Sequence, residues 1–215
     1  MALPPHAPYP GAVYQPQWDE RSIRVLTCDA VEVMYDCWWP HKPGWGLDSL
    51  RGTATYYRIS ASLLNERAEQ IRSEPLTRIE EDVHRPDLPL RLARTPLACW
   101  SNRSFSDPEA YAVSLGPEAD SFVRTASEER INAAQLVLCP FGPKGARKRG
   151  VLVSPTQGTS FSALELLWLA QNIQSPLLRE PPAGVGLYRL GFQGGVPSYY
   201  LGGQRGEASY LKNPV

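Results

Sequence analysis

The stretch Gly142-Pro-Lys-Gly-Ala-Arg-Lys-Arg-Gly150 lies between two short apolar runs, Gln135–Phe141 and Val151–Val153. A glycine-rich polar segment between two runs rich in Leu and Val is typical of a β-hairpin loop. The sequence therefore predicts a projecting hairpin around residues 135–153 with a strongly basic loop. The four cations of this loop are Lys144, Arg147, Lys148 and Arg149.

Charge and length restrict the classes of protein to which the chain can belong. The 215 residues carry 22 Lys and Arg against 22 Asp and Glu, so the formal net charge is zero. A neutral chain has no overall attraction to a polyanion or a membrane, and local clusters carry the electrostatic signal. No apolar run approaches the roughly 20 residues that span a bilayer. We therefore expect no membrane partner, and a core that needs no disulfide or metal.

The cysteines indicate the redox compartment. Cys28, Cys37, Cys99 and Cys139 form no Cys-x-x-Cys pair, and the start of the chain has neither the basic nor the apolar region of a signal peptide. These features favour free thiols in a reducing cytoplasm.

The order of predicted elements indicates an α+β fold. Residues 1–19 form an extended proline-rich arm, and residues 20–215 form a single domain that contains the hairpin. Strands are expected over Ile23–Cys28, Val31–Cys37, Leu97–Trp100, Ala110–Leu115 and Val185–Phe192. Helices are expected over Leu47–Ile71, where apolar residues recur every 3 or 4 positions, over Ser127–Ala134, and after the capping-box spacing Ser162-Ala-Leu-Glu165. Pro75–Pro96 is expected to be a loop. This order suits helices packed on one face of an antiparallel sheet.

Catalytic motifs are weak in this sequence. The histidines His6, His41 and His84 lie in proline-rich loops and are not part of a nucleophile motif. Cys99-Trp100 weakly resembles the nucleophile of papain-like proteases, although the preceding Gly and Cys are absent. A small hydrolase that uses Cys99 with His84 or His41 is therefore an alternative to a buried core thiol.

Metal and cofactor motifs are weaker still. Cys28, Cys37 and His41 lack the spacings of structural zinc sites, and no phosphate-binding or dinucleotide-binding glycine motif occurs. We expect no catalytic residue, metal or cofactor.

The cations of the hairpin could neutralise phosphates, or they could simply keep a surface loop soluble. The glycine-rich end of the chain leaves a similar choice, between tight β-turns and a backbone that approaches an anion around Gln193, Gln204 and Arg205. Both features together favour a nucleic-acid ligand, with Phe105, Trp45 or Tyr199 as stacking surfaces for bases. A protein–protein adaptor that presents Trp38, Trp39 and Trp45 is a further alternative.

The order of motifs resembles the RAMP superfamily of CRISPR proteins, in particular the type IV and type I subunit that caps the 5′ end of the guide RNA. An early strand, Ile23–Val33, precedes Gly46-Leu47-Asp48-Ser49-Leu50, which is similar to the start of the first RAMP helix. Leu88-Pro89-Leu90 and the segment Ala98–Phe105 are similar to stretches of the type IV subunit. A buried helix precedes the glycine-rich residues 184–206, although Pro176–Pro182 intervenes.

The resemblance implies a ferredoxin-like (RRM-like) antiparallel sheet with helices on one face and a projecting basic hairpin. It also implies a non-catalytic RNA-binding subunit of a CRISPR ribonucleoprotein that serves antiviral defence in the prokaryotic cytoplasm. The expected partners are the guide RNA, other effector subunits and target DNA. The expected RNA contacts are the four hairpin cations, Asn102 and Arg103 beside them, and Gln193, Gln204 and Arg205.

Overall fold

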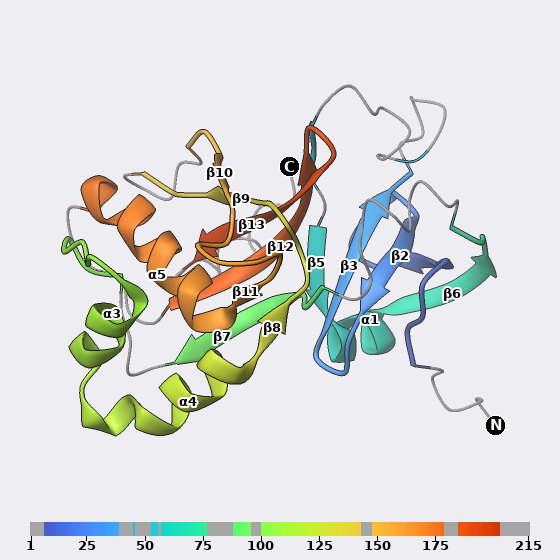
Figure 1. Cartoon of the computed structure of the whole chain (residues 1–215). Coiled ribbons are helices and arrows are strands. Elements are labelled where there is room, and N and C mark those ends of the chain that lie inside the picture. The colour runs from blue at the N-terminus through green and yellow to red at the C-terminus, as the bar shows by residue number, and fades with distance from the viewer. Residues whose placement is uncertain are drawn as a thin grey trace. The chain divides into compact units, whose positions relative to one another are not determined.

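The computed structural model of the chain describes residues 7–38, 45, 53–55, 57–76, 88–95, 100–142, 148–178 and 185–202. These residues form an α+β structure with mostly antiparallel sheets and four α-helices (Figure 1). The chain divides into two compact units, which we call the N-terminal and the C-terminal unit. The N-terminal unit comprises Met1–Leu90 and Leu190–Pro197, and the C-terminal unit comprises Arg91–Arg189 and Ser198–Val215.

The N-terminal unit contains a five-stranded antiparallel sheet with the order β5-β3-β2-β1-β6. Its strands are β1 (Ala12–Pro16), β2 (Ile23–Cys28), β3 (Glu32–Cys37), β5 (Tyr57–Ser60) and β6 (Ala68–Ser73). The helix α1 (Ala61–Arg67) joins the two edge strands directly. A flat sheet of five strands would hold its edges about 19 Å apart, whereas seven helical residues rise only about 10 Å. The sheet must therefore curl until its edges approach each other.

The curled sheet buries apolar side chains on both of its faces. One cluster contains Ala12, Tyr14, Ile23, Val25, Val33, Cys37, Ile59, Ala61 and Leu64. On the opposite face of β2 and β3, Leu26 and Met34 pack with Leu90 and Phe192. Both faces of β3 are therefore covered.

A buried ion pair lies on the second face of β2 and β3. Arg24 and Asp36 are opposite each other in the two strands and are 4% and 2% exposed. Arg24 Nη2 lies 2.9 Å from Asp36 Oδ2, and the guanidinium carbon lies 4.7 Å from the ring centre of Trp45. Trp45 Nε1 in turn donates to Glu74 Oε2 at 2.7 Å. The buried charges are thus compensated by hydrogen bonds and by an aromatic face.

The C-terminal unit is built on a mixed sheet with the order β10-β9-β13-β12-β7, in which β9 and β13 are parallel. Its strands are β7 (Arg91–Thr95), β9 (Leu136–Cys139), β10 (Val151–Val153), β12 (Val185–Gln193) and β13 (Val196–Gly202). The tip of the β12–β13 hairpin belongs to the N-terminal unit, where Gly191, Phe192 and Gln193 pair with β4 (Thr53–Thr55). A separate two-stranded sheet joins β8 (Arg130–Ile131) and β11 (Phe161–Ser162).

The helix α5 (Ala163–Gln174) is the buried centre of the C-terminal unit. The helices α3 (Pro108–Ser114) and α4 (Asp120–Glu128) pack against it, as Figure 1 shows. Short 3-10 helices lie at Pro117–Ala119 and Ser175–Leu177. The predicted cap of α5 is confirmed, because Ser162 Oγ accepts from the Glu165 N–H at 3.0 Å. The Glu165 carboxylate accepts from the Thr156 N–H and hydroxyl at 2.6 and 2.7 Å.

Several predicted elements are confirmed. The structure contains the predicted strands Ile23–Cys28 as β2, Val31–Cys37 as β3 and Val185–Phe192 as β12. It also contains the predicted hairpin, in which β9 and β10 are antiparallel. The proline-rich arm is extended over Ala12–Pro16, where it pairs as β1 with β2 and β6.

The predicted helix over Leu47–Ile71 is wrong where the structure describes it. Tyr57–Ser60 is a strand that pairs with β3, and only Ala61–Arg67 is helical before β6 begins. β-branched and aromatic residues favour the strand. Ser60 then starts the helix, because its hydroxyl accepts from the Leu63 N–H at 3.2 Å. Residues 47–52 and 56 lie outside the described residues.

The predictions for residues 75–134 also need correction. The expected strand Ala110–Leu115 is helix α3, because Asp107 Oδ1 accepts from the Ala110 N–H at 2.7 Å and Pro108 occupies the first turn. The expected helix Ser127–Ala134 is displaced, since α4 ends at Glu128. The loop Pro75–Pro96 contains the strand β7. Trp100 is not in a strand, and residues 77–87 and 96–99 lie outside the described residues.

We expect Asp36→Ala to lower the free energy of unfolding by about 3–5 kcal/mol, because it leaves the Arg24 charge buried without its carboxylate. Urea unfolding of the full chain measures this change. Glu66→Gln, at an exposed position on α1, serves as the matched control and should stay within about 0.5 kcal/mol of the parent. A loss below about 1 kcal/mol in Asp36→Ala would show that the ion pair contributes little.

Candidate functional site

The predicted site residues that the structure describes lie mostly on the surface. Asn102 and Arg103 are exposed in the loop before α3, and Lys148 and Arg149 are exposed just before β10. Gln193 is half-buried at the end of β12, followed by the turn glycines Gly194 and Gly195 with φ of +57° and +77°. These values fit a tight hairpin turn. Lys144, Arg147, Gln204 and Arg205 lie outside the described residues.

Three amide side chains of α5 hold the segments that carry these residues. Gln174 Oε1 accepts from the Phe141 N–H at 3.0 Å, and Gln174 Nε2 donates to the Phe141 carbonyl at 2.8 Å. Asn172 makes the same pair of bonds with the backbone of Phe105, at 2.9 and 2.8 Å. Each side-chain amide thus makes the same pair of hydrogen bonds, one to a backbone N–H and one to a backbone carbonyl, that a residue of an adjacent β-strand would make. The sequence-based search missed these residues.

Gln171 makes the corresponding contacts with the start of the loop. Its Oε1 accepts from the Ser101 N–H at 3.1 Å, and its Nε2 donates to the carbonyls of Ser101 and Arg103 at 2.7 and 2.6 Å. Gln171 and Gln174 are both 0% exposed, so these bonds satisfy groups that water does not reach. Loop Ser101–Phe105, which carries Asn102 and Arg103, is therefore fixed to the helix at both of its ends.

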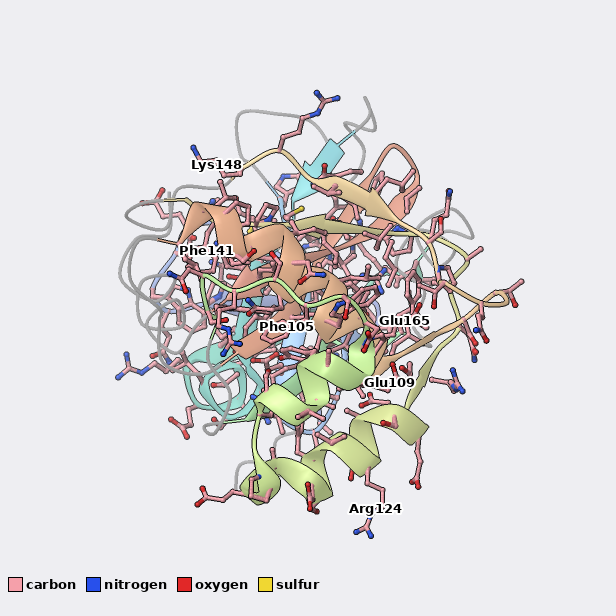
Figure 2. All side chains as sticks on the ribbon, turned by 60° about the vertical axis from the view of Figure 1, so that its left-hand side comes forward. Phe105, Glu109, Arg124, Phe141, Lys148 and Glu165 are labelled. Atoms are coloured by element: carbon pink, nitrogen blue, oxygen red, sulfur yellow. The ribbon has the colours of Figure 1, made fainter. Side chains whose placement is uncertain are left out.

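The two cation-bearing segments consequently meet on one helix. Gln171 and Gln174 are three residues apart, which corresponds to a rise of about 4.5 Å. Loop Ser101–Phe105 is bound to the first amide, and Phe141, at the base of the basic hairpin, is bound to the second. Figure 2 shows Phe141 and Lys148 toward the end of α5, and Phe105 on the segment that crosses this helix.

Lys148 is held at the base of the hairpin. Its N–H donates to the Pro140 carbonyl at 2.9 Å. Its side chain covers Gly142 so closely that a Cβ at that position would collide with the Lys148 Cε. The glycine therefore leaves room for the lysine stem. Arg103, Lys148 and Arg149 take part in none of the ion pairs found among the described residues.

Charge is segregated along the C-terminal unit. Residues 105–129, which include α3 and α4, contain six acidic residues and the single cation Arg124. Residues 142–149 contain four cations and no acidic residue. Figure 2 shows Lys148 and Arg124 at opposite sides of the view. This segregation would direct a polyanion to the hairpin and away from α3 and α4.

The described residues include only part of the alternative sites. They contain no group of three or more His, Cys, Asp or Glu side chains that could hold a metal ion. Burial raises the pKa of Cys37 to about 12, so this thiol is protonated at neutral pH. Cys28 and Cys37 are free cysteines. Cys99 and the histidines His6, His41 and His84 lie outside the described residues.

Aromatic exposure corrects two further expectations. Trp45 is 6% exposed and Tyr199 is 0% exposed, so neither presents a face to a base or a partner in this structure. Trp38 is 38% exposed, and Trp39 lies outside the described residues. Of the three proposed stacking surfaces, Phe105 alone is half-buried rather than buried.

None of the helices in the described part of the chain has the length and apolar character that crossing a bilayer requires.

We expect Gln174→Ala to lower the free energy of unfolding by about 1–3 kcal/mol, because it removes both hydrogen-bonding partners of the Phe141 backbone from a buried site. Urea unfolding of the full chain tests this. Gln135→Ala, at an exposed position close to β9, is the matched control and should be nearly neutral. Equal stability of the two variants would contradict an anchoring role for Gln174.

Comparison with known proteins gives no relative for this chain. No model of a known protein family matches the sequence, and neither the curated proteins nor the solved structures contain a match.

Proposed function

We propose that this chain is a non-catalytic RNA-binding protein whose RNA surface combines loop Ser101–Phe105 with the basic hairpin. The observation that supports this proposal is the anchoring of both segments by Gln171 and Gln174, about one turn apart on α5. Preorganised loops lose less entropy on binding than free loops do.

The chemistry of the exposed groups suits phosphates. Arg103 can donate two parallel hydrogen bonds to a phosphate, and Lys148 and Arg149 can neutralise further phosphates. Asn102 is exposed beside Arg103 and offers both a donor and an acceptor to a base edge or a ribose. A surface of this kind binds a polyanion through charge and through a few polar contacts.

The finer proposal assigns the chain to a CRISPR ribonucleoprotein of the prokaryotic cytoplasm, as the subunit that holds the 5′ end of the guide RNA. It is supported by the resemblance at Leu88-Pro89-Leu90 and at Ala98–Phe105, a segment that includes the anchored loop. Under this proposal the sheet of the C-terminal unit corresponds to the RRM-like sheet, from which it differs in the parallel pairing of β9 with β13. Other effector subunits and target DNA are the remaining partners, and Gln193, Gln204 and Arg205 add contacts to the RNA.

The dependence of affinity on salt tests the proposed function. Each phosphate contact with single-stranded RNA contributes about −0.7 to the slope of log K against log salt concentration. Lys148→Ala combined with Arg149→Ala should therefore flatten the slope by about 1.4, and replacement of all four hairpin cations should flatten it by about 2.8. Fluorescence anisotropy of a labelled single-stranded RNA at several salt concentrations measures these slopes.

A matched pair of cations provides the control. Arg124 on α4 and Arg130 on β8 are both exposed, and their double replacement by Ala removes the same charge from elsewhere in the C-terminal unit. We expect this variant to keep the slope of the parent. If both double variants flatten the slope equally, the hairpin is not the RNA-binding element, and if the parent binds no RNA, the proposed function is wrong.

A further inference from the structure

The backbone of Phe105 is clamped by α5. Its N–H donates to Asn172 Oδ1 at 2.9 Å, and its carbonyl accepts from Asn172 Nδ2 and from Trp168 Nε1, both at 2.8 Å. The backbone N–H and the backbone carbonyl of Phe105 therefore both form hydrogen bonds with side chains of α5. The position from which the Phe105 side chain leaves the backbone is therefore fixed relative to the helix.

The Phe105 ring is supported from within the unit. The ring of Tyr111 lies at a centroid distance of 5.6 Å and an interplanar angle of 63°, which is an edge-to-face contact. Tyr111 is 1% exposed, so the supporting ring is part of the core. Phe105 itself is only half-buried. It is therefore an aromatic group that is held by the core and still reaches the surface.

An exposed cation lies next to this ring. The guanidinium carbon of Arg103 is 5.7 Å from the centre of the Phe105 ring, and Arg103 is exposed. An exposed guanidinium over an aromatic face gains only about 0.5–1 kcal/mol. Arg103 can thus be displaced by a planar ligand that stacks on Phe105, and it can then bind the phosphate attached to that ligand.

We propose that Phe105 is a stacking platform for one unpaired base of a single-stranded RNA, with Arg103 bound to the adjoining phosphate. This inference rests on the proposed function and specifies its ligand. A base within a duplex has both of its faces covered, so the platform selects RNA with an unstacked base. Asn172 is a positioning residue, since it acts on the RNA through the backbone of Phe105.

The test uses the full chain and two probes, a single-stranded oligouridylate and the same ribose-phosphate backbone without bases. Phe105→Leu should weaken oligouridylate binding about 5- to 150-fold, the range that one stacked base supplies. Its salt slope should be unchanged, because the phosphate contacts remain. Phe105→Tyr, which keeps the aromatic face, should bind like the parent, and the backbone without bases should bind the parent as weakly as oligouridylate binds Phe105→Leu.

The outcomes separate this inference from the proposed function. If the parent binds both probes equally and Phe105→Leu has no effect, the platform is refuted while RNA binding stands. If the parent binds neither probe, both proposals are refuted.

A second measurement needs no variant, so it is decisive even if Phe105→Leu fails to fold. Ultraviolet crosslinking of the parent to oligouridylate, followed by trypsin and mass spectrometry, should place the crosslink at Phe105 within the peptide Ser104–Arg124. Crosslinks confined to other peptides would overturn the platform.

Discussion

Gln171 and Gln174 are amide side chains with no exposure to solvent, on a helix whose other buried residues are mostly apolar. An amide buried without partners would cost several kcal/mol. Each amide is stabilised by the backbone of a segment that comes from elsewhere in the chain: Gln171 binds Ser101 and Arg103, and Gln174 binds Phe141. The same bonds satisfy the helix side chains and fix the loops. The need to satisfy these two buried amides with hydrogen bonds therefore also determines the surface positions of Asn102, Arg103 and Lys148.

The constraint links folding to the proposed activity. Loop Ser101–Phe105 and the hairpin together carry five cations and no acidic residue, while three of the four charged residues in α3 and α4 are acidic. Charge alone would attract a polyanion, but flexible cations would lose entropy when they bind it. Because α5 fixes the backbone at the base of each segment, that part of the loss has already occurred on folding. Phe105 adds a fixed aromatic group to the same surface, which phosphate contacts alone would not provide.

Short-range signals in the sequence were predictive. The cap at Ser162, the strands β2 and β12, and the β9–β10 hairpin depend on neighbouring residues, and all are confirmed. Asp107-Pro108 is an equally local signal for the start of a helix, and it prevails over the strand predicted for Ala110–Leu115. The strand β5 also has a local signal, in its aromatic and β-branched residues, but the apolar repeat over Leu47–Ile71 competes with it. Pairing with β3, more than 20 residues earlier, fixes Tyr57–Ser60 as a strand. Ala61 and Leu64, from the predicted helical stripe, are buried as expected, but in a much shorter helix.

The anchoring amides belong to the same class of long-range effects. Gln171 and Gln174 lie on the buried side of α5, and two polar residues at this spacing in an apolar helix were a usable sign of internal hydrogen bonding. The identity of their partners, about 70 and 33 residues away, is not contained in any local pattern. For this reason the exposed cations were found from the sequence, whereas the residues that position them were not.

Residue-resolved NMR of the full chain during titration with a single-stranded RNA tests most directly whether the two anchored segments act as one surface. The account predicts that the backbone amide signals of Ser101–Phe105 and of Phe141 and Lys148 shift together with a single dissociation constant, while those of α4 do not move. Shifts in only one of the two segments, or shifts centred on α4, would contradict it.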